Sequence, residues 1–386
     1  MKTLVKLIKH GISCACKGVK FNIEYKLSKG SYPTFLIYKA TMRCNSRCKT
    51  CNIWKGGEGK IELTIEELDT ILTNPFWKEV KYVNITGGEP FLRKDLVDIL
   101  HIIKRNLPKV RIIAIPTNGL LTNKIVKDVD TILSSILSDA KILLSVTVSI
   151  DGDEKTHNFI RGVPIAYHRA INTLNELKKL EAKYPNFTVG IETVVSSMNL
   201  HILEDILAYH SRITDHLNYT PMIYAPYFEN ESNNPGIRGQ NLARVAEFYQ
   251  KLKDNNPSMA YYYENVVKYL KKGRRSYPCL GGYKTICLES NGDVTPCVML
   301  PSVVFGNALK EDIESVWFGE RAWRIRKHLK KSSFCKHCLN NCDIINNYSE
   351  EFLHFIAFLL VRPKIIIKLY RSLKEGKYSS KYINAL

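Results

Sequence analysis

The sequence lacks the features of a membrane-spanning or secreted protein. It has no run of about 18 apolar residues, which is roughly what a helix needs to cross a bilayer. Lys6 and Lys9 interrupt the apolar segment at its amino terminus, where a signal peptide keeps an unbroken apolar region. Without such a signal we expect a cytoplasmic protein, and disulfide frameworks are rare in that compartment.

Acidic residues are scarce relative to basic ones. The chain has 56 Lys and Arg against 37 Asp and Glu, and residues 1–30, 321–336 and 362–386 each hold seven basic residues and no more than one acidic residue. This clustering favours an anionic partner such as lipid headgroups, nucleic acid or a phosphorylated substrate, with a solubilising surface as the alternative. Nucleic acid ranks last, because no motif of interleaved aromatic and basic residues is present.

The rest of the composition is that of a folded α/β protein. The 386 residues are 45% apolar and 24% charged, a length that allows two domains or one large domain with an appendage. Apolar runs at 35–40, 82–86, 111–116, 143–150, 189–195 and 219–224 predict strands, and amphipathic segments at 64–72, 95–104, 123–137, 166–180 and 200–212 predict helices. This alternation predicts a parallel barrel or open sheet, with the loops that follow the strands gathered at one edge.

Cysteine is abundant, and its spacing indicates metal chemistry. Cys44, Cys48 and Cys51 directly follow the first predicted strand, as three soft ligands in one short loop. Structural zinc sites use four ligands, so this trio needs a distant fourth ligand to hold zinc. It can also hold three irons of a [4Fe–4S] cluster and leave the fourth iron open to a substrate or cofactor. The spacing alone leaves both alternatives open.

Polar residues follow the other strands at the same predicted edge. Gly87, Gly88, Glu89 and Pro90 end the second strand, where the glycines permit close backbone approach and Glu89 is placed to accept hydrogen bonds from an ammonium group. Later strands end in polar sets that include Thr117, Ser149, Asp151 and Arg161. Their repeated position indicates one shared site.

These motifs, in this order over residues 34–225, resemble those of the radical S-adenosylmethionine (radical SAM) superfamily. The resemblance implies a partial (β/α)6 TIM-like barrel and a [4Fe–4S] cluster on Cys44, Cys48 and Cys51, whose open iron binds the amine and carboxylate of SAM. It implies that residues 87–90 contact the methionyl amine, that Thr117, Ser149 and Asp151 lie near the ribose and the reacting region, and that Arg161 contacts a carboxylate. Such enzymes accept an electron from a reductant such as ferredoxin or flavodoxin and cleave SAM to a 5′-deoxyadenosyl radical, which abstracts a hydrogen atom from the substrate.

A second set of cysteines lies near the carboxyl terminus. Cys279 and Cys297 flank the hairpin signal Asn291-Gly292-Asp293, and Cys335, Cys338 and Cys342 follow. Their chemistry is that of an iron–sulfur or zinc site. The region also resembles the auxiliary-cluster modules called SPASM and twitch, although it is shorter than the full seven-cysteine pattern. The resemblance implies one auxiliary cluster on Cys279, Cys297, Cys335 and Cys338, with Cys342 as an alternative ligand, whereas Cys287 is interpreted as core.

Five segments are expected: a basic segment at 1–33, the radical SAM core at 34–225, a linker or helical region at 226–274, a small cysteine-rich C-terminal module at 275–345 and a basic amphipathic tail at 346–386. Residues 226–240 are turn-rich and predict a boundary or mobile loop. Residues 352–370 predict a helix that either packs on the barrel or lies on an anionic membrane, which makes the inner face of the membrane a candidate location. The substrate classes left open are a peptide and a lipid or lipid-linked glycan, and the alternative of another class is a non-catalytic iron–sulfur or zinc protein.

Overall fold

The computed structural model describes residues 16–57, 59–230, 241–256, 259–276, 278–339 and 358–374. Cys342 and most of the predicted tail lie outside these residues, as do positions 231–240 of the predicted loop. Within the described part of the chain, no helix is both long and apolar enough to cross a membrane.

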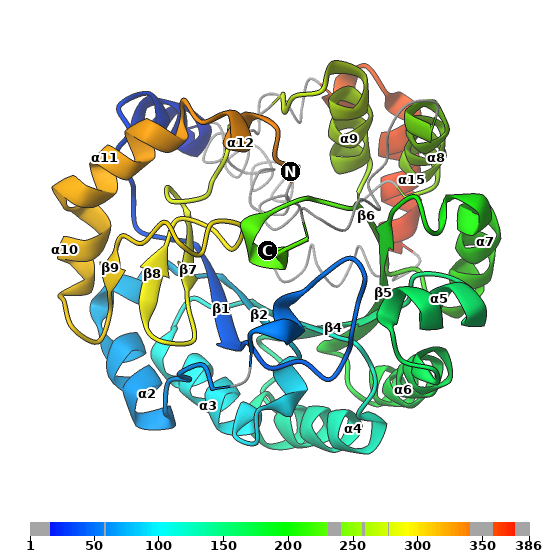
Figure 1. The fold of residues 1–386 in the computed structure, drawn as a ribbon, viewed down its shortest axis with the longest axis horizontal. Helices are drawn as coiled ribbons and strands as arrows, with labels where there is room; N and C mark the ends of the chain where they lie inside the picture. Colours follow the sequence, from blue (N-terminus) through cyan, green and yellow to red (C-terminus); the bar gives the residue numbers. More distant parts are fainter. Residues whose placement is uncertain are drawn as a thin grey trace, which may run out of the picture.

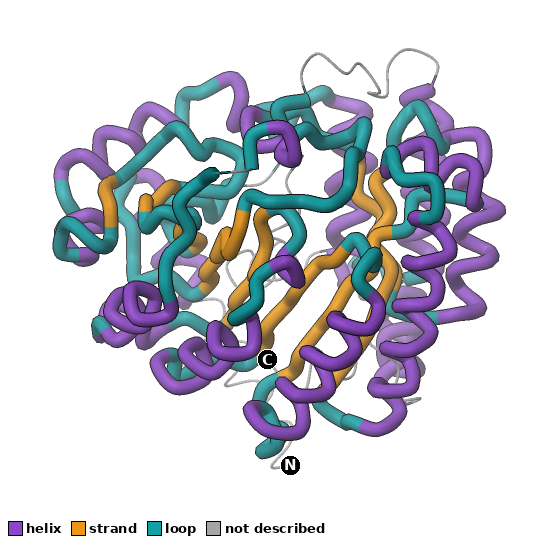
Figure 2. The backbone as a smooth tube through the Cα atoms, turned by 60° about the horizontal axis from the view of Figure 1, so that its bottom comes forward, coloured by secondary structure: helices purple, strands orange, loops and turns teal. Residues whose placement is uncertain are grey.

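The centre of the molecule is an open barrel of six parallel strands. They are β1 (Phe35–Thr41), β2 (Tyr82–Gly87), β3 (Ile112–Thr117), β4 (Leu143–Ser149), β5 (Phe187–Val195) and β6 (Leu217–Pro221). Each pairs in parallel with the next, and Figure 2 shows the strands as a curved sheet with helices along its outer side. The partial (β/α)6 barrel is therefore confirmed. Strand β6 begins at Leu217, two residues earlier than predicted. It ends at Pro221, whose ring nitrogen has no hydrogen to donate to the next ladder hydrogen bond.

Helices cover the outer face of the barrel. They are α2 (Ile65–Thr73), α3 (Leu96–Asn106), α4 (Thr122–Thr131), which continues as the π-helical turn η4 (Ile132–Ile136), α5 (Glu154–Arg161), α6 (Ala166–Lys183) and α7 (Leu203–Ile213). Short 3-10 turns link them at η1 (Ile53–Lys55), η2 (Pro75–Glu79), η3 (Pro90–Leu92) and η5 (Leu200–Ile202). The predicted capping box is present, because the side chain of Thr64 accepts from the backbone N–H of Glu67 and the Glu67 carboxylate accepts from that of Thr64. Leu68, Ile71 and Leu72 of that helix are buried against the sheet.

The cysteine-rich module continues the same sheet. Its strand β7 (Thr285–Leu288) pairs in parallel with β1, and β8 (Asp293–Thr295) and β9 (Gly306–Asn307) follow in antiparallel pairs. The predicted hairpin turn is present, with Gly292 at φ +85, a conformation that glycine adopts without strain. The helices α10 (Ile313–Phe318), α11 (Glu320–Leu329) and α12 (Ser333–Lys336) complete the described part of the module. Barrel and module therefore share one backbone hydrogen-bond network.

A helical layer lies beside the β6 edge of the barrel. It contains α8 (Asn241–Asn255), α9 (Ala260–Lys272) and α15 (Pro363–Lys374), which lie close together in Figure 1. Residues 226–230, predicted as part of a boundary or mobile loop, instead form the 3-10 turn η6 (Pro226–Phe228) and its continuation, packed against the first cysteine loop. The alternative of a mobile loop is corrected for these five residues, because the hydrogen bonds described below hold them, and the alternative of a boundary stays a prediction.

Candidate active site

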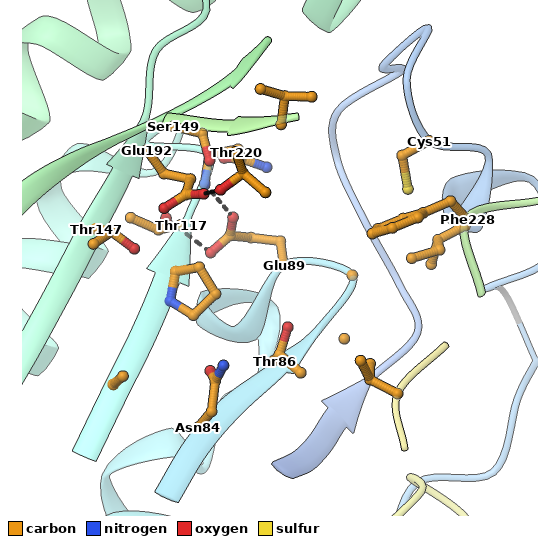
Figure 3. A pocket seen from close by; sticks show the side chains of 18 of the residues that line it. Cys51, Asn84, Thr86, Glu89, Thr117, Thr147, Ser149, Glu192, Thr220 and Phe228 are labelled. Carbon is orange, nitrogen blue, oxygen red and sulfur yellow. Dashed lines mark hydrogen bonds between the residues drawn. The ribbon is translucent and has the colours of Figure 1, made fainter. Parts of the chain in front are cut away.

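A cavity of about 400 Å³ opens at the carboxyl ends of the barrel strands. Its wall includes all three cysteines of the first cluster together with Gly87, Gly88, Glu89, Thr117, Ser149 and Arg161. Figure 3 shows the polar side chains of the strand ends grouped on one side, with Cys51 and Phe228 on the other. The structure thus brings together most of the residues that the sequence predicts for one site.

The first cysteine loop is anchored to the end of α5. The backbone N–H of Arg47 donates to the carbonyl of Arg161 at 2.9 Å, and that of Lys49 donates to the carbonyl of Ile160 at 2.8 Å. The Arg161 guanidinium reaches the sulfur of Cys48 at 3.7 Å. The amide of Asn118 lies 3.9 Å from the sulfur of Cys44. Hydrogen-bond donors that face the sulfurs stabilise the thiolates and shift the reduction potential of a metal cluster bound to them.

The donor chemistry of this loop fits an iron–sulfur cluster. Burial raises the pKa of Cys44 to about 11 and that of Cys51 to about 12, so without metal these thiols are protonated and binding iron releases the protons. Across the described ranges, no three His, Cys, Asp or Glu side chains are arranged to hold a single metal ion. In a cluster each thiolate binds a different iron, so the three sulfurs do not have to converge on one point.

Gly87 and Gly88 bring the end of β2 against the cysteine loop. The backbone N–H of Gly88 donates to the carbonyl of Thr41 at 2.8 Å, and that of Glu89 donates to the carbonyl of Arg43 at 2.9 Å. A Cβ atom at Gly87 would collide with Thr41, and one at Gly88 would collide with Arg43. The glycines were predicted to let the backbone approach a ligand, and the structure shows them needed for approach to the loop itself.

Glu89 is a buried carboxylate with its geometry fixed by three donors. It accepts from the hydroxyl of Thr117 at 2.9 Å and from the backbone N–H groups of Asn118 at 2.7 Å and Phe91 at 3.2 Å. Burial raises its pKa to about 7, although these donors and Arg161 act in the opposite direction. A cation entering the cavity would favour the ionised form. Pro90, predicted beside it as a contact, begins η3 and does not line the cavity.

Asp151 and Arg161 form an ion pair beside the cavity. The Arg161 Nε atom lies 2.7 Å from Oδ2 of Asp151, and the backbone N–H of Val194 donates to Oδ1 of Asp151 at 3.0 Å. The ring nitrogen Nδ1 of His157 accepts from the backbone N–H of Asp151 at 3.1 Å. Asp151 is fully buried and does not line the cavity. It therefore positions Arg161, which does line the cavity, and the expectation that Asp151 lies near the ribose and the reacting region stays a prediction.

Residues 223–230 complete the cavity wall opposite the strand ends. The backbone N–H of Asn52 donates to the carbonyl of Phe228 at 2.7 Å, and the Tyr227 hydroxyl donates to the carbonyl of Gly87 at 2.8 Å. The side chain of Asn230 is fully buried and donates to the carbonyls of Thr50 and Ile223, both at 2.9 Å. The sequence placed Tyr227 and Phe228 in a linker, and no local pattern marks them as site residues.

Glu192 is a further cavity residue that the sequence analysis missed. It lies on β5, whose register places it opposite Ser149 of β4, and its carboxylate accepts from the Thr220 hydroxyl. Burial raises its pKa to about 7, while Thr220 and Asn218 on β6 hydrogen-bond to it and lower that pKa. The sequence signal that could have identified Glu192 is a lone charged residue inside an otherwise largely apolar strand.

The structure also places four of the second-cluster cysteines in one region. Cys279 and Cys297 flank Gly281, whose backbone N–H donates to the sulfur of Cys279 at 3.4 Å. Burial raises the pKa of Tyr25, and the neighbouring thiols of Cys279 and Cys335 add to the rise. Cys338 is buried in the core cluster against which Cys297 packs. Cys287 is fully buried on β7 and donates its S–H to Glu289, which confirms its interpretation as core.

Comparison with known proteins agrees with these two groups of residues. Residues 38–219 match the Radical SAM superfamily, and residues 279–342 match SPASM, an iron–sulfur cluster-binding domain. Among curated proteins, the chain is 22% identical over 315 residues to the antilisterial bacteriocin subtilosin biosynthesis protein AlbA of Bacillus subtilis. That match covers 80% of this chain and 64% of AlbA.

Solved structures share the fold. SuiB of Streptococcus suis bound to SAM has a TM-score of 0.57 at 18% identity, covering 86% of this chain and 78% of SuiB. SuiB also matches in its complex with the precursor peptide SuiA. Native anSMEcpe with bound SAM has a TM-score of 0.58 at 18% identity, covering 86% of this chain and 98% of that one. The chain belongs to the radical SAM superfamily and carries a C-terminal SPASM domain, so its cofactors are SAM and [4Fe–4S] clusters.

Proposed function

We propose that this enzyme uses SAM to remove a hydrogen atom from a peptide during peptide maturation. The observation that carries the proposal is that one cavity is lined by three cluster cysteines, by the anchored carboxylate Glu89 and by Arg161. When bound, the cluster and SAM supply a 5′-deoxyadenosyl radical after one electron arrives from a donor such as ferredoxin or flavodoxin. The peptide substrate is supported by the bacteriocin-biosynthesis relative AlbA and by the fold shared with SuiB, which has been solved with a precursor peptide.

In this proposal the chain's own residues bind the cluster and SAM, orient them and shield them from water. Cys44, Cys48 and Cys51 hold the cluster, and Glu89 accepts hydrogen bonds from the methionyl ammonium of SAM. Arg161, fixed by Asp151, binds a carboxylate, and Thr117 and Ser149 offer hydroxyl groups along the same wall. Phe228 and Trp54 cover the opposite wall and exclude water, which protects a reactive intermediate.

The proposal includes one auxiliary cluster held by Cys279, Cys297, Cys335 and Cys338. Its support is the placement of Cys279 and Cys297 beside Gly281, of Cys338 in the adjoining core and of Cys335 near Tyr25, which Cys279 also neighbours, in the region that matches SPASM. Cys342, which lies outside the described residues, is the alternative ligand. Two clusters per chain give about eight irons, and the first cluster alone gives about four. Iron quantitation of the Cys279→Ala variant therefore tests this assignment, with a fall from about eight to about four expected.

The peptide proposal is tested by isotope transfer. The anaerobically reconstituted enzyme is incubated with SAM, a reductant and a set of deuterated candidate peptides. A cognate peptide is expected to increase 5′-deoxyadenosine formation, to pass deuterium into it and to change mass itself. SAM cleavage that no peptide stimulates, with every peptide mass unchanged, would contradict the proposal.

The surface of residues 358–374 supports a second candidate, a lipid or lipid-linked glycan met at an anionic membrane. Phe358 and Ile365 pack on α9, whereas Leu360 and Val361 are 72% and 71% exposed and Ile367 is 52% exposed. Lys364 and Lys368 lie on the same short segment. Exposed apolar groups beside lysines suit an anionic lipid surface. Flotation with anionic but not with neutral vesicles is expected for this candidate, and no flotation with either would exclude it.

A further inference from the structure

The inner face of the barrel is hollow below the strand ends and carries several polar groups there. Parallel barrels of this kind are usually filled there by branched apolar side chains. In this chain apolar side chains still form much of the cavity wall, but a set of hydroxyl, amide and carboxylate groups from β2, β4, β5 and β6 lies among them: Asn84, Ser145, Thr147, Glu192, Asn218 and Thr220. This lining adjoins the predicted SAM contacts but includes none of them.

Two of these polar groups are buried without a partner in the described residues. The hydroxyl of Ser145 and the amide oxygen of Asn84 have no hydrogen-bond partner, and Ser145 is only 1% exposed. A buried polar group without a partner costs about 1–3 kcal/mol. Both residues line the cavity, so a polar ligand placed there would satisfy them.

The charge of the cavity is unbalanced. Among the described residues that line it, Glu89 and Glu192 are acidic, and Arg161 is the only Lys or Arg. Arg161 is already paired with Asp151 at 2.7 Å. The ammonium group of SAM pairs with Glu89 in the proposed function. Among the described residues Glu192 then has no salt-bridge partner, and Arg161 acts on it only from a distance. A buried carboxylate with no counter-charge is costly, so a cation that donates to it gains binding energy.

We propose that Glu192, held by Thr220 and Asn218, is the specificity-determining residue of the substrate pocket and binds a basic side chain, Lys or Arg, of the substrate peptide. This inference rests on the proposed function. Thr220 and Asn218 donate to the carboxylate and fix its orientation, while Ser145 and Asn84 take the remaining polar atoms of the substrate. The cation is thereby held on the strand side of the cavity, across from Cys51 (Figure 3).

The inference is tested by selecting peptides on the holoenzyme. Reconstituted enzyme loaded with SAM is incubated anaerobically with a random peptide library, and the bound peptides are sequenced. The wild type is expected to enrich Lys or Arg at one position. Glu192→Gln, which keeps the size and removes the charge, is expected to lose that enrichment, and Glu192→Lys is expected to replace it by Asp or Glu. Glu204→Gln on the outer surface is the matched control and is expected to behave as the wild type.

SAM binding, measured separately on each holoenzyme, separates the two proposals. It is expected to be the same in the wild type and in Glu192→Gln, since Glu192 contacts the substrate. A loss of SAM affinity in Glu192→Gln would assign this residue to the cofactor and overturn the inference. Peptides enriched without a basic position, or with the same profile in Glu192→Gln, would overturn it and leave the proposed function standing. A wild-type enzyme that enriches no peptide would contradict the proposed function as well.

Discussion

At the scale of single residues, Cys48 is the most deeply buried of the three cluster cysteines, only 9% exposed, and it receives the guanidinium of Arg161. Replacing it by alanine leaves two thiols for a cluster that needs three in this loop. We expect Cys48→Ala to lose the iron of the first cluster and to form no 5′-deoxyadenosine after anaerobic reconstitution. Cys16→Ala, at an exposed cysteine, is the control and is expected to keep both. Product formation at the wild-type rate by Cys48→Ala would refute the assignment.

The prediction for Asp151 also concerns single residues, because Asp151 affects SAM binding only through its neighbour Arg161. The substitution Asp151→Asn removes the charge that fixes Arg161, and a hydrogen bond to a charged group contributes about 1.5–3 kcal/mol. We expect SAM to bind about tenfold more weakly, since about 1.4 kcal/mol corresponds to that factor. Equilibrium binding of SAM to the holoenzyme checks this, with Asp98→Asn on the exposed face of α3 as the control. Unchanged affinity would show that Arg161 does not depend on Asp151.

The grouping of the candidate site residues around one cavity was predictable where chemistry and chain position coincide, while their roles stay predictions. The cysteine trio and Glu89 follow strands, Thr117 and Ser149 end strands, and the carboxyl ends of parallel strands meet at one edge. Arg161, at the end of α5, reaches the same cavity. Glu192 was not predicted as a site residue, because it lies within a segment whose apolar neighbours led us to interpret the whole segment as a buried strand. Asp151 was assigned to the cavity because sequence spacing does not show which way a side chain points.

At the scale of elements, the turn at residues 223–230 acts as a clasp on the cysteine loop. Asn230 joins three backbone groups of the two segments, and a buried group left unsatisfied costs about 1–3 kcal/mol. We expect Asn230→Ala to loosen this clasp and to increase the rate at which a chelator removes iron from the reconstituted protein. The exposed Asn172→Ala on α6 serves as the control. An iron-loss rate equal to that of the wild type would show that the clasp does not protect the cluster.

Element-level predictions succeeded where the signal is local. All six barrel strands were predicted, and the capping box located the start of α2. The position of residues 226–230 was not predictable in the same way. The turn-rich composition of this segment is typical of a mobile loop, whereas contacts with residues distant in sequence hold it in place: hydrogen bonds to Asn52, Thr50 and Gly87 and the packing of Tyr227 in the core.

At the scale of the whole molecule, barrel and SPASM domain are joined through a buried ion pair. Lys39 of β1 is fully buried and lies 2.9 Å from Glu289, just after β7, with its ammonium group 4.2 Å from the centre of the Tyr227 ring. Removing one partner of a buried pair costs about 3–5 kcal/mol, whereas replacing both costs less. The sequence predicted the cysteine module but not this junction, because the pairing of β7 with β1 joins residues far apart in the chain.

The junction predicts one cooperative unfolding transition for the two parts. We expect Lys39→Met to lower the free energy of unfolding by about 3–5 kcal/mol, and Lys39→Met combined with Glu289→Gln to recover part of the loss. Denaturant titration followed by both fluorescence and circular dichroism checks this. Two separate transitions, of which Lys39→Met shifts only one, would show that barrel and module fold independently.

The central claim is that Cys44, Cys48 and Cys51 hold a [4Fe–4S] cluster with an iron open to SAM. Its most direct test is electron paramagnetic resonance of the reduced, anaerobically reconstituted protein during titration with SAM. We predict that SAM changes the spectrum of one cluster in the wild type and that this change is missing in Cys48→Ala. Zinc at this loop, or a cluster whose spectrum SAM leaves unaltered, would contradict the account.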